Sequence, residues 1–244
     1  MHVGQGVAII DCVRDLTSDV RELTLQLIEP SELVFAPGQS LSFEVPTARG
    51  SKPAIRYYSL ASPPSEGQKV VLLLSASEKG MGPHYLFTRK AGEKIQFGGP
   101  DGSFYLHDDR RRNILFVATG TGIAPFRSML YALFERPITQ TVTLFWGLRS
   151  EQDIYYQNEL EALAKQYPNF TFVIALSRSQ KTWAGAKGRV TQLVEKISSV
   201  DDLSVYVCGN KKMVLQVTDI IRRKGECPIY REKYYDELEH KHHA

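Results

Sequence analysis

The second half of the chain alternates between apolar runs and amphipathic stretches, and this alternation constrains the fold more than any other feature. Four apolar runs lack the strict alternation of a half-exposed strand: residues 114–118, 142–146, 171–176 and 205–208. Helical patterns fill the gaps and follow the last run: residues 125–134, 156–166, 190–197 and 213–224. Continuous apolar runs are typical of parallel strands buried on both faces. These runs recur at the interval of roughly 30 residues that a strand–helix–strand unit needs. The second half is therefore predicted to form an α/β doubly wound parallel sheet.

The first half has a different pattern, in which short β-rich runs are separated by turn residues. These runs are residues 7–13, 23–28, 40–45, 55–59, 70–75 and 94–97. In one of them Leu23, Leu25 and Leu27 alternate with Thr24 and Gln26, as expected for a strand with one buried face. Several short strands joined by proline- and glycine-containing turns predict a small antiparallel β-barrel.

A charged segment, Asp108-Asp109-Arg110-Arg111-Arg112, separates the two halves. It is either a linker between domains or a polar turn between two strands, and the strand–helix alternation that follows favours a linker. We therefore predict an N-terminal domain over residues 1–108 and a C-terminal domain over residues 109–244.

Composition argues against several classes of protein. The net charge of +3 is too weak for a nucleic-acid-binding protein, which needs a concentrated basic face. No run approaches the roughly 20 apolar residues of a membrane span, and the first residues lack the basic and apolar regions of a signal peptide. Cys12, Cys208 and Cys227 are scattered and form no disulfide framework, and three thiols are too few for a plant-type iron–sulfur cluster. We expect a cytoplasmic protein.

A glycine-rich turn follows the first apolar run of the second half. It reads Thr119-Gly120-Thr121-Gly122 and leads through Ile123 and Ala124 to Pro125, at the start of a predicted helix. Between a parallel strand and a helix, such a turn presents backbone N–H groups and a helix N-terminus to a pyrophosphate. The third glycine of the dinucleotide fingerprint is replaced by Pro125, which the first helical turn tolerates. The alternative is a tight turn that binds no ligand.

Five short motifs are spread along nearly the whole chain, in the order and spacing that they have in a known protein family. They are Arg56-Tyr57-Tyr58-Ser59, Gly99-Pro100-Asp101-Gly102-Ser103-Phe104, Gly120–Pro125, Gly147-Leu148-Arg149 through Glu159-Leu160, and Val207-Cys208-Gly209. Together they resemble the ferredoxin–NADP(+) reductase superfamily. Within this superfamily the chain resembles the reductase module of oxygenase systems, without an iron–sulfur domain. The resemblance implies an FAD-binding barrel followed by an NAD(P)-binding α/β domain.

For FAD, the resemblance implies that Arg56 holds the pyrophosphate, Tyr58 packs on the isoalloxazine ring and Ser59 donates a hydrogen bond near flavin N5. Tyr57 belongs to the same motif, and ordinary strand aromatics are the alternative for both tyrosines. A second flavin segment corresponds to Gly80-Met81-Gly82, where Pro83 replaces the family's serine. The alternative there is a simple loop leading into a helix.

The chain's last residues offer one further FAD contact. Tyr234 resembles the closing aromatic near the flavin, although the chain continues for ten more residues. That tail contains His240, His242 and His243, for which a metal site or a solvated, frayed end are the alternatives, and we expect no metal site.

For the nucleotide, the resemblance places Cys208 and Gly209 beside the nicotinamide, with Ser59 and Cys208 as the catalytic pair. A buried structural cysteine is the alternative for Cys208. Ser177-Arg178 is expected at the ribose, and Arg149 and Arg189 are further candidates. Arginine contacts favour NADPH, although NADH remains possible and solvated arginines are the alternative.

The expected activity is transfer of hydride from NAD(P)H to FAD, followed by release of electrons to a separate carrier such as a ferredoxin or flavodoxin. The basic clusters 110–112 and 222–224 either attract an acidic carrier or are solvated faces. Two alternatives stay open. One is an NAD(P)H-dependent free-flavin reductase, and the other is a non-catalytic nucleotide-sensing module on the same scaffold.

Overall fold

The computed structural model describes residues 5–46, 53–76, 85–109 and 112–234. Contacts divide the chain into two compact units. The first consists of the residues up to Leu106 together with Ala124–Glu135, and the second consists of His107–Ile123 and Arg136–Tyr235. The predicted boundary at residue 108 stays a prediction, because the chain changes unit more than once.

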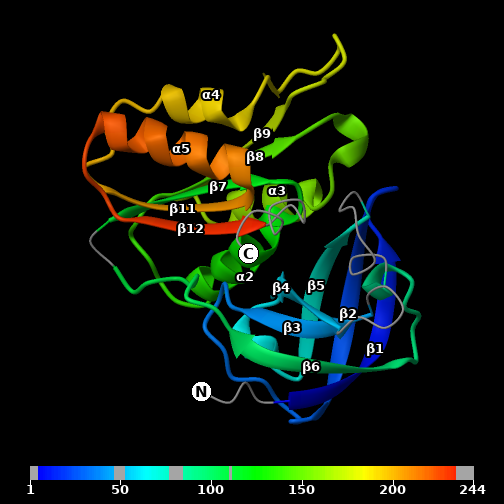
Figure 1. Cartoon of the computed structure of the whole chain (residues 1–244). Helices are drawn as coiled ribbons and strands as arrows, with labels where there is room; N and C mark the ends of the chain where they lie inside the picture. Colours follow the sequence, from blue (N-terminus) through cyan, green and yellow to red (C-terminus); the bar gives the residue numbers. More distant parts are fainter. Residues whose placement is uncertain (1–4, 47–52, 77–84, 110–111, 235–244) are drawn as a thin grey trace, which may run out of the picture. The chain divides into compact units, whose positions relative to one another are not determined.

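Six antiparallel strands form the sheet of the first unit (Figure 1). They are β1 (Gln5–Asp15), β2 (Val20–Glu29), β3 (Ser40–Val45), β4 (Ala54–Ser59), β5 (Lys69–Ser75) and β6 (Lys94–Asp101). Their order is β4-β3-β6-β1-β2-β5. The two outer strands meet just beyond β4, where Leu60 bridges to Leu72 and the N–H of Ala61 donates to the carbonyl of Val71 at 2.8 Å. This closure makes the sheet a barrel, as predicted.

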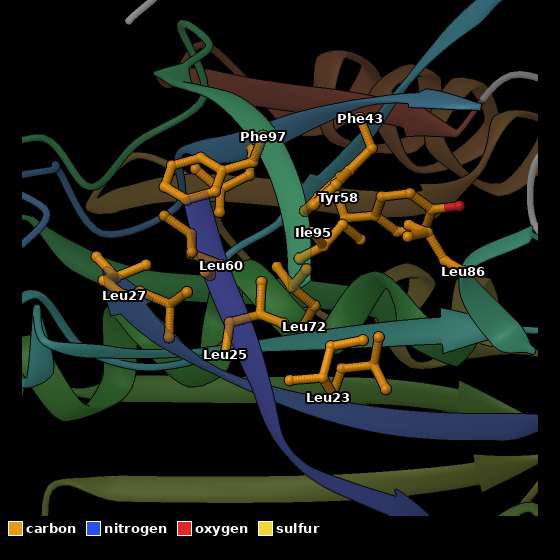
Figure 2. Packing of buried hydrophobic residues seen from close by; sticks show 14 of the residues in the cluster. Leu23, Leu25, Leu27, Phe43, Tyr58, Leu60, Leu72, Leu86, Ile95 and Phe97 are labelled. Atoms are coloured by element: carbon orange, nitrogen blue, oxygen red, sulfur yellow. The ribbon is translucent and has the colours of Figure 1, made fainter. Parts of the chain in front are cut away.

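Alternating apolar side chains fill the barrel. Leu23, Leu25 and Leu27 of β2 are all buried, and Thr24 and Gln26 between them are partly exposed. Figure 2 shows these leucines on one side of β2, within a cluster that also contains residues of β3 to β6. The burial of each such side chain contributes roughly 1.5–3 kcal/mol to the free energy of folding. The period-2 pattern of the sequence is thus the inside–outside pattern of the barrel wall.

The second unit is built on a six-stranded sheet in which every neighbouring pair is parallel. Its strands are β7 (Asn113–Thr119), β8 (Val142–Leu148), β9 (Phe170–Leu176), β10 (Ala186–Lys187), β11 (Leu203–Asn210) and β12 (Ile229–Tyr234). The order β10-β9-β8-β7-β11-β12 reverses direction at β7, because successive strands are added first on one side of β7 and then on the other. That reversal is the topological switch point of a doubly wound sheet, where ligands bind beyond the carboxyl ends of the strands.

Helices of the second unit cover the sheet as predicted. They are α3 (Gln157–Gln166), α4 (Val190–Glu195) and α5 (Lys211–Lys224). The helices α4 and α5 bury valines and isoleucines against Leu115 and Val117 of β7 and Val205 and Val207 of β11. Figure 1 shows α4 and α5 together along one face of the sheet. In the described part of the chain, no helix combines the length and apolarity needed to cross a bilayer.

The helix α2 (Ala124–Phe134) follows the glycine-rich turn directly but clusters with the barrel. The ring of Phe126 lies edge-on to Phe104 at 6.0 Å, and Arg127 donates to the carbonyl of Ala61 at 2.8 Å. The side chain of Ser65 in the short turn η1 (Pro64–Glu66) donates to Glu135. The chain therefore leaves the second unit between Ile123 and Ala124 and returns after Glu135.

Candidate functional site

The switch point brings the glycine-rich turn next to the end of β11. Ala118 of β7 pairs with Cys208 of β11, and the turn η2 (Gly120–Ile123) follows β7 directly. A Cβ atom on Gly122 would lie 2.5 Å from the carbonyl oxygen of Cys208. Gly209 has φ +131°, and its Cβ would lie 2.8 Å from the carbonyl oxygen of Thr119. These two glycines allow the strand ends to approach one another this closely.

Gly120 has a different role from Gly122. Its φ is +52°, a left-handed conformation that favours glycine, and a Cβ atom on it would meet nothing within 4 Å. The turn is therefore open at Gly120 and closed against β11 at Gly122. An open turn that carries the first N–H groups of a helical run suits a phosphate group, so the residues present fit the pyrophosphate of a dinucleotide.

Thr119 ties the turn to the neighbouring strand. Its hydroxyl accepts a hydrogen bond from the backbone N–H of Asn210 at 3.1 Å. Thr121 and Gly122 are buried, and Pro125 lies in the first turn of α2, where its missing N–H has no helical partner to lose. The predicted nucleotide residues 119–122, 208 and 209 are thus brought together at one place.

Cys208 is completely buried in the second unit. Its Sγ lies 4.0 Å from Oε2 of Glu232, which is its register partner on β12. Sequence reasoning did not assign Glu232 to the site, because its strand was not recognised. The predicted place of Cys208 beside the nicotinamide stays a prediction.

The predicted ribose residues also converge, at the ends of β8 and β9. The N–H of Arg178 donates to the carbonyl of Arg149 at 2.7 Å, and the N–H and hydroxyl of Ser177 donate to Leu148 at 3.0 and 3.3 Å. The N–H of Gly188 donates to the end of β9, which brings Arg189 to the same edge. Arg149, Arg178 and Arg189 are exposed, and within the described residues their side chains form no ion pair or hydrogen bond. Three uncompensated positive charges suit a dianionic phosphate.

On β4 the flavin motif is divided between two faces. Arg56 and Tyr58 pair with Phe43 and Leu41 and share their inward face. Tyr58 is only 7% exposed and packs edge-on to Phe43 at 5.9 Å, in the cluster that also contains Leu86 (Figure 2). The guanidinium and the phenol ring of the motif therefore lie on the same side of the strand.

Tyr57 lies on the opposite face of β4 and is 56% exposed. With Ile55 it lines a cavity of about 920 Å³ on the barrel, together with Ser42 and Glu44 of β3 and other residues of β1 and β6. The structure thus separates Tyr57 from Arg56 and Tyr58, which the sequence motif groups together. Ser59 is buried at the end of β4, opposite Ser40.

Some predicted residues cannot be placed. Gly80, Met81 and Gly82 lie outside the described residues, as do His240, His242 and His243. The backbone of Tyr234 ends β12 opposite Asn210, and its side chain is outside the described part. The flavin contacts expected for Gly80, Met81, Gly82 and Tyr234 therefore stay predictions.

Two contacts near the predicted site carry no sequence signal of their own. The indole of Trp146 donates from Nε1 to the carbonyl oxygen of Gly120 at 3.0 Å. Arg127 reaches the carbonyl of Ala61, two residues after Ser59. Trp146 lies within an apolar run and Arg127 within a helical pattern, so each residue type is explained locally without its distant partner.

The basic clusters considered for partner binding are partly engaged within the protein. Arg112 donates to the carbonyl of Asp201 at 2.6 Å, and Arg223 and Lys224 both contact Glu195. Arg110 and Arg111 lie outside the described residues. The described side chains of these clusters therefore offer less free charge than the sequence suggests.

Comparison with protein families identifies both halves of the chain. Residues 8–105 match the oxidoreductase FAD-binding domain, and residues 116–219 match the oxidoreductase NAD-binding domain. Ferredoxin–NADP reductase B of Sorangium cellulosum is 33% identical over 232 residues, which cover 92% of this chain and 93% of that protein. The reductase component DmpP of a Pseudomonas phenol 2-monooxygenase is 29% identical over 93% of this chain, which spans 65% of its length.

Solved structures agree on the fold. The Amycolatopsis cytochrome P450 reductase GcoB is 30% identical with a TM-score of 0.83, covering 96% of this chain and 71% of that one. A ferredoxin–NADP+ reductase from Plasmodium falciparum, solved with 2′P-AMP, is 23% identical with a TM-score of 0.78, covering 95% and 97%. The likeness to the second structure supports the fold alone.

Proposed function

Because this chain belongs to the ferredoxin–NADP(+) reductase superfamily of FAD- and NAD-binding oxidoreductases, we propose that it takes hydride from NADPH and passes the electrons through FAD to a separate carrier protein. The observation that carries the proposal is the turn at the switch point. It is open at Gly120, begins a helical run and lies beside Cys208 at the end of the neighbouring strand. The pyrophosphate binds at this turn, and the nicotinamide lies along the end of β11 next to Cys208 and Gly209.

The arginine cluster supports NADPH over NADH. The three arginines lie on one side of the switch point. Arg149 follows the end of β8, Arg178 lies just beyond β9, and Arg189 directly precedes α4. The 2′-phosphate of NADPH supplies the negative charge that these exposed guanidinium groups lack, and the hydroxyl of Ser177 adds a donor. NADH binds the same turn without this contribution, so it is the weaker substrate.

The strand β4 is proposed to hold the flavin. Arg56 binds the pyrophosphate of FAD, and Tyr58, on the same face, supplies the ring that packs near the isoalloxazine. Ser59 donates a hydrogen bond near N5, and Gly80, Met81, Gly82 and Tyr234 complete the predicted contacts. Bound FAD supplies the group that accepts hydride and can release electrons singly.

The electron acceptor is proposed to be a ferredoxin or a flavodoxin. The similarity to ferredoxin–NADP reductase B over 93% of that protein's length supports a carrier of this kind. The scattered cysteines, all free of disulfides, support a reducing cytoplasm as the location. A flavin domain over residues 1–108 and a nucleotide domain over residues 109–244 complete the proposal, supported by the family matches within these ranges.

Anaerobic stopped-flow absorbance tests the proposal. We expect NADPH to bleach the flavin of the purified protein, NADH to do so more weakly, and reduced ferredoxin or flavodoxin to appear when an oxidised carrier is added. Flavin lost on extensive dialysis, with free flavin reduced instead, would establish the free-flavin reductase. Flavin that stays oxidised with both nucleotides would overturn the redox function and favour a nucleotide-sensing module.

A further inference from the structure

A buried indole holds the carbonyl of the nucleotide turn. Trp146 of β8 is completely buried, and its Nε1 donates to the carbonyl oxygen of Gly120 at 3.0 Å. A buried indole N–H needs an acceptor, and here it takes the first carbonyl of the turn. The contact spans 26 positions of sequence and joins the strand β8 to the turn that follows β7.

The direction of this carbonyl fixes the direction of the next amide. The Gly120–Thr121 peptide is trans and planar, so its C=O and N–H point to opposite sides. Since the oxygen of Gly120 points to the indole, the N–H of Thr121 points away from Trp146. Gly120 itself adopts φ +52°, which glycine reaches without steric cost, and the indole gives its carbonyl a fixed partner outside the turn.

Trp146 is held firmly enough to act as such a contact. Its strand position pairs with Ala118, immediately before the turn. Tyr155 packs edge-on against the indole, with ring centroids 4.8 Å apart and an interplanar angle of 82°. At the next residue, a Cβ on Gly147 would lie 3.0 Å from Val190 and 3.2 Å from Thr119. The indole therefore has little freedom to rotate or withdraw.

We propose that Trp146 is a positioning residue for the dinucleotide pyrophosphate, because its indole N–H fixes the Gly120 carbonyl and so aims the Thr121 amide at the phosphate. This inference rests on the proposed function and names one determinant of its nucleotide site. Trp146 touches no substrate and acts only through the peptide plane. Loss of the indole N–H leaves the turn free to reorient, and binding then includes the cost of ordering it.

The test compares two ligands with the variant Trp146→Phe. Isothermal titration measures the affinity of the FAD-loaded protein for NADP+, which contains the pyrophosphate, and for 2′-AMP, which contains only the adenosine and the 2′-phosphate. We expect the affinity for NADP+ to fall about tenfold and the affinity for 2′-AMP to stay unchanged. A purely structural role would weaken both ligands alike.

Trp183→Phe is the matched control. Trp183 is the only other tryptophan of the chain, and its Nε1 also donates to a backbone carbonyl, that of Ala186 at 3.1 Å. We expect Trp183→Phe to leave the ratio of the two affinities unchanged. If Trp146→Phe does not fold, 3-benzothienylalanine at position 146 replaces the N–H by sulfur in a ring of nearly the same shape.

The outcomes separate this inference from the proposed function. Wild-type protein that binds neither ligand overturns the proposed function. Wild-type protein that binds both, with a position-146 variant that retains full NADP+ affinity or loses both ligands equally, overturns the inference alone. A selective loss of NADP+ affinity in that variant, absent from Trp183→Phe, supports it.

Discussion

Arg178 is the side chain whose proposed role in nucleotide preference can be tested most directly. It is exposed beyond β9, next to Arg149, with no ion-pair partner in the described residues. Arg178→Ala removes the guanidinium for which we propose a charge-assisted contact with the 2′-phosphate, and such contacts contribute about 1.5–3 kcal/mol. We expect KM for NADPH to rise about tenfold or more and KM for NADH to stay nearly constant, as measured by steady-state kinetics.

The control for this prediction is Arg223→Ala, which removes an exposed arginine of α5 that pairs with Glu195 of α4 and Asp219 of α5. The ratio of the two KM values should not change in that variant. Equal increases for NADPH and NADH in Arg178→Ala would contradict the 2′-phosphate assignment.

Gly122 is a second residue whose effect follows from geometry. Its missing Cβ would lie 2.5 Å from the Cys208 carbonyl oxygen and 2.8 Å from Cα of Gly209, and backbone atoms cannot swing aside. We expect Gly122→Ala to destabilise the protein by about 1–3 kcal/mol and to weaken NADP+ binding, because the turn must move away from β11. Thermal unfolding and nucleotide titration measure the two effects.

Gly92→Ala is the comparison variant for Gly122→Ala. Gly92 has φ +87° but open space around its missing Cβ, so alanine there introduces backbone strain without a clash. It should cost about 1 kcal/mol and leave NADP+ affinity unchanged. If Gly122→Ala behaves like Gly92→Ala in both measurements, close packing at the switch point is not what requires this glycine.

At the level of elements, the sequence pattern predicted the strands that are buried on both faces best. The apolar runs of β7, β8, β9 and β11 fall where they were expected because parallel strands in a covered sheet need apolar side chains throughout. The strand β12 was missed because Arg231, Glu232 and Lys233 interrupt its apolar character, which an edge strand paired only with β11 tolerates.

Contacts between elements could not be predicted in this way. The bond from Trp146 to Gly120 and the bond from Arg127 to Ala61 join segments 26 and 66 positions apart. Local pattern assigns each residue to its element but does not say which distant carbonyl it meets. The site motifs were recognisable because each is a short continuous run of sequence, such as Arg56–Ser59 on β4 or the turn after β7, whereas the contacts that orient them depend on the tertiary fold.

The helix α2 leads to a prediction at this scale. It begins directly after the glycine-rich turn η2. The side chain of Arg127 donates a hydrogen bond to the carbonyl of Ala61, two residues beyond Ser59 of β4. We expect Arg127→Leu to slow flavin bleaching at saturating NADPH on the order of tenfold, because a small misplacement of reacting groups costs rate. The Kd for NADP+ should stay nearly constant.

Arg127→Lys provides the matched variant, since lysine keeps the charge and a donor that reaches toward the same carbonyl. It should recover part of the lost rate in stopped-flow measurements. A bleaching rate in Arg127→Leu equal to that of the wild type would show that this attachment does not position the reacting groups.

At the level of the whole molecule, the described residues include two separate hydrophobic clusters, one in each unit. One fills the barrel with side chains from β1 to β6, and the other lies between the sheet and the helices α4 and α5. The change from a period-2 pattern to strand–helix alternation foretold two kinds of architecture. The pattern did not predict that Ala124–Glu135, which lies within the strand–helix alternation, clusters with the barrel. An amphipathic helix pattern shows that one face is apolar but does not specify which surface that face covers.

Two compact units with a different ligand proposed for each predict separable ligand effects on stability. A ligand that binds only one folded unit at 100 times its Kd stabilises that unit by about 2.7 kcal/mol. For a unit of roughly 100 residues, this raises the midpoint of unfolding by about 10 °C or more. We expect differential scanning calorimetry of the flavin-depleted chain to show that FAD raises the unfolding temperature of the barrel unit and that NADP+ raises that of the sheet unit.

Arg56→Ala should reduce the shift that FAD causes, and Arg178→Ala should reduce the shift that NADP+ causes. A single transition that both ligands shift equally would mean that α2, which follows the glycine-rich turn directly and clusters with the barrel, makes the two units unfold as one.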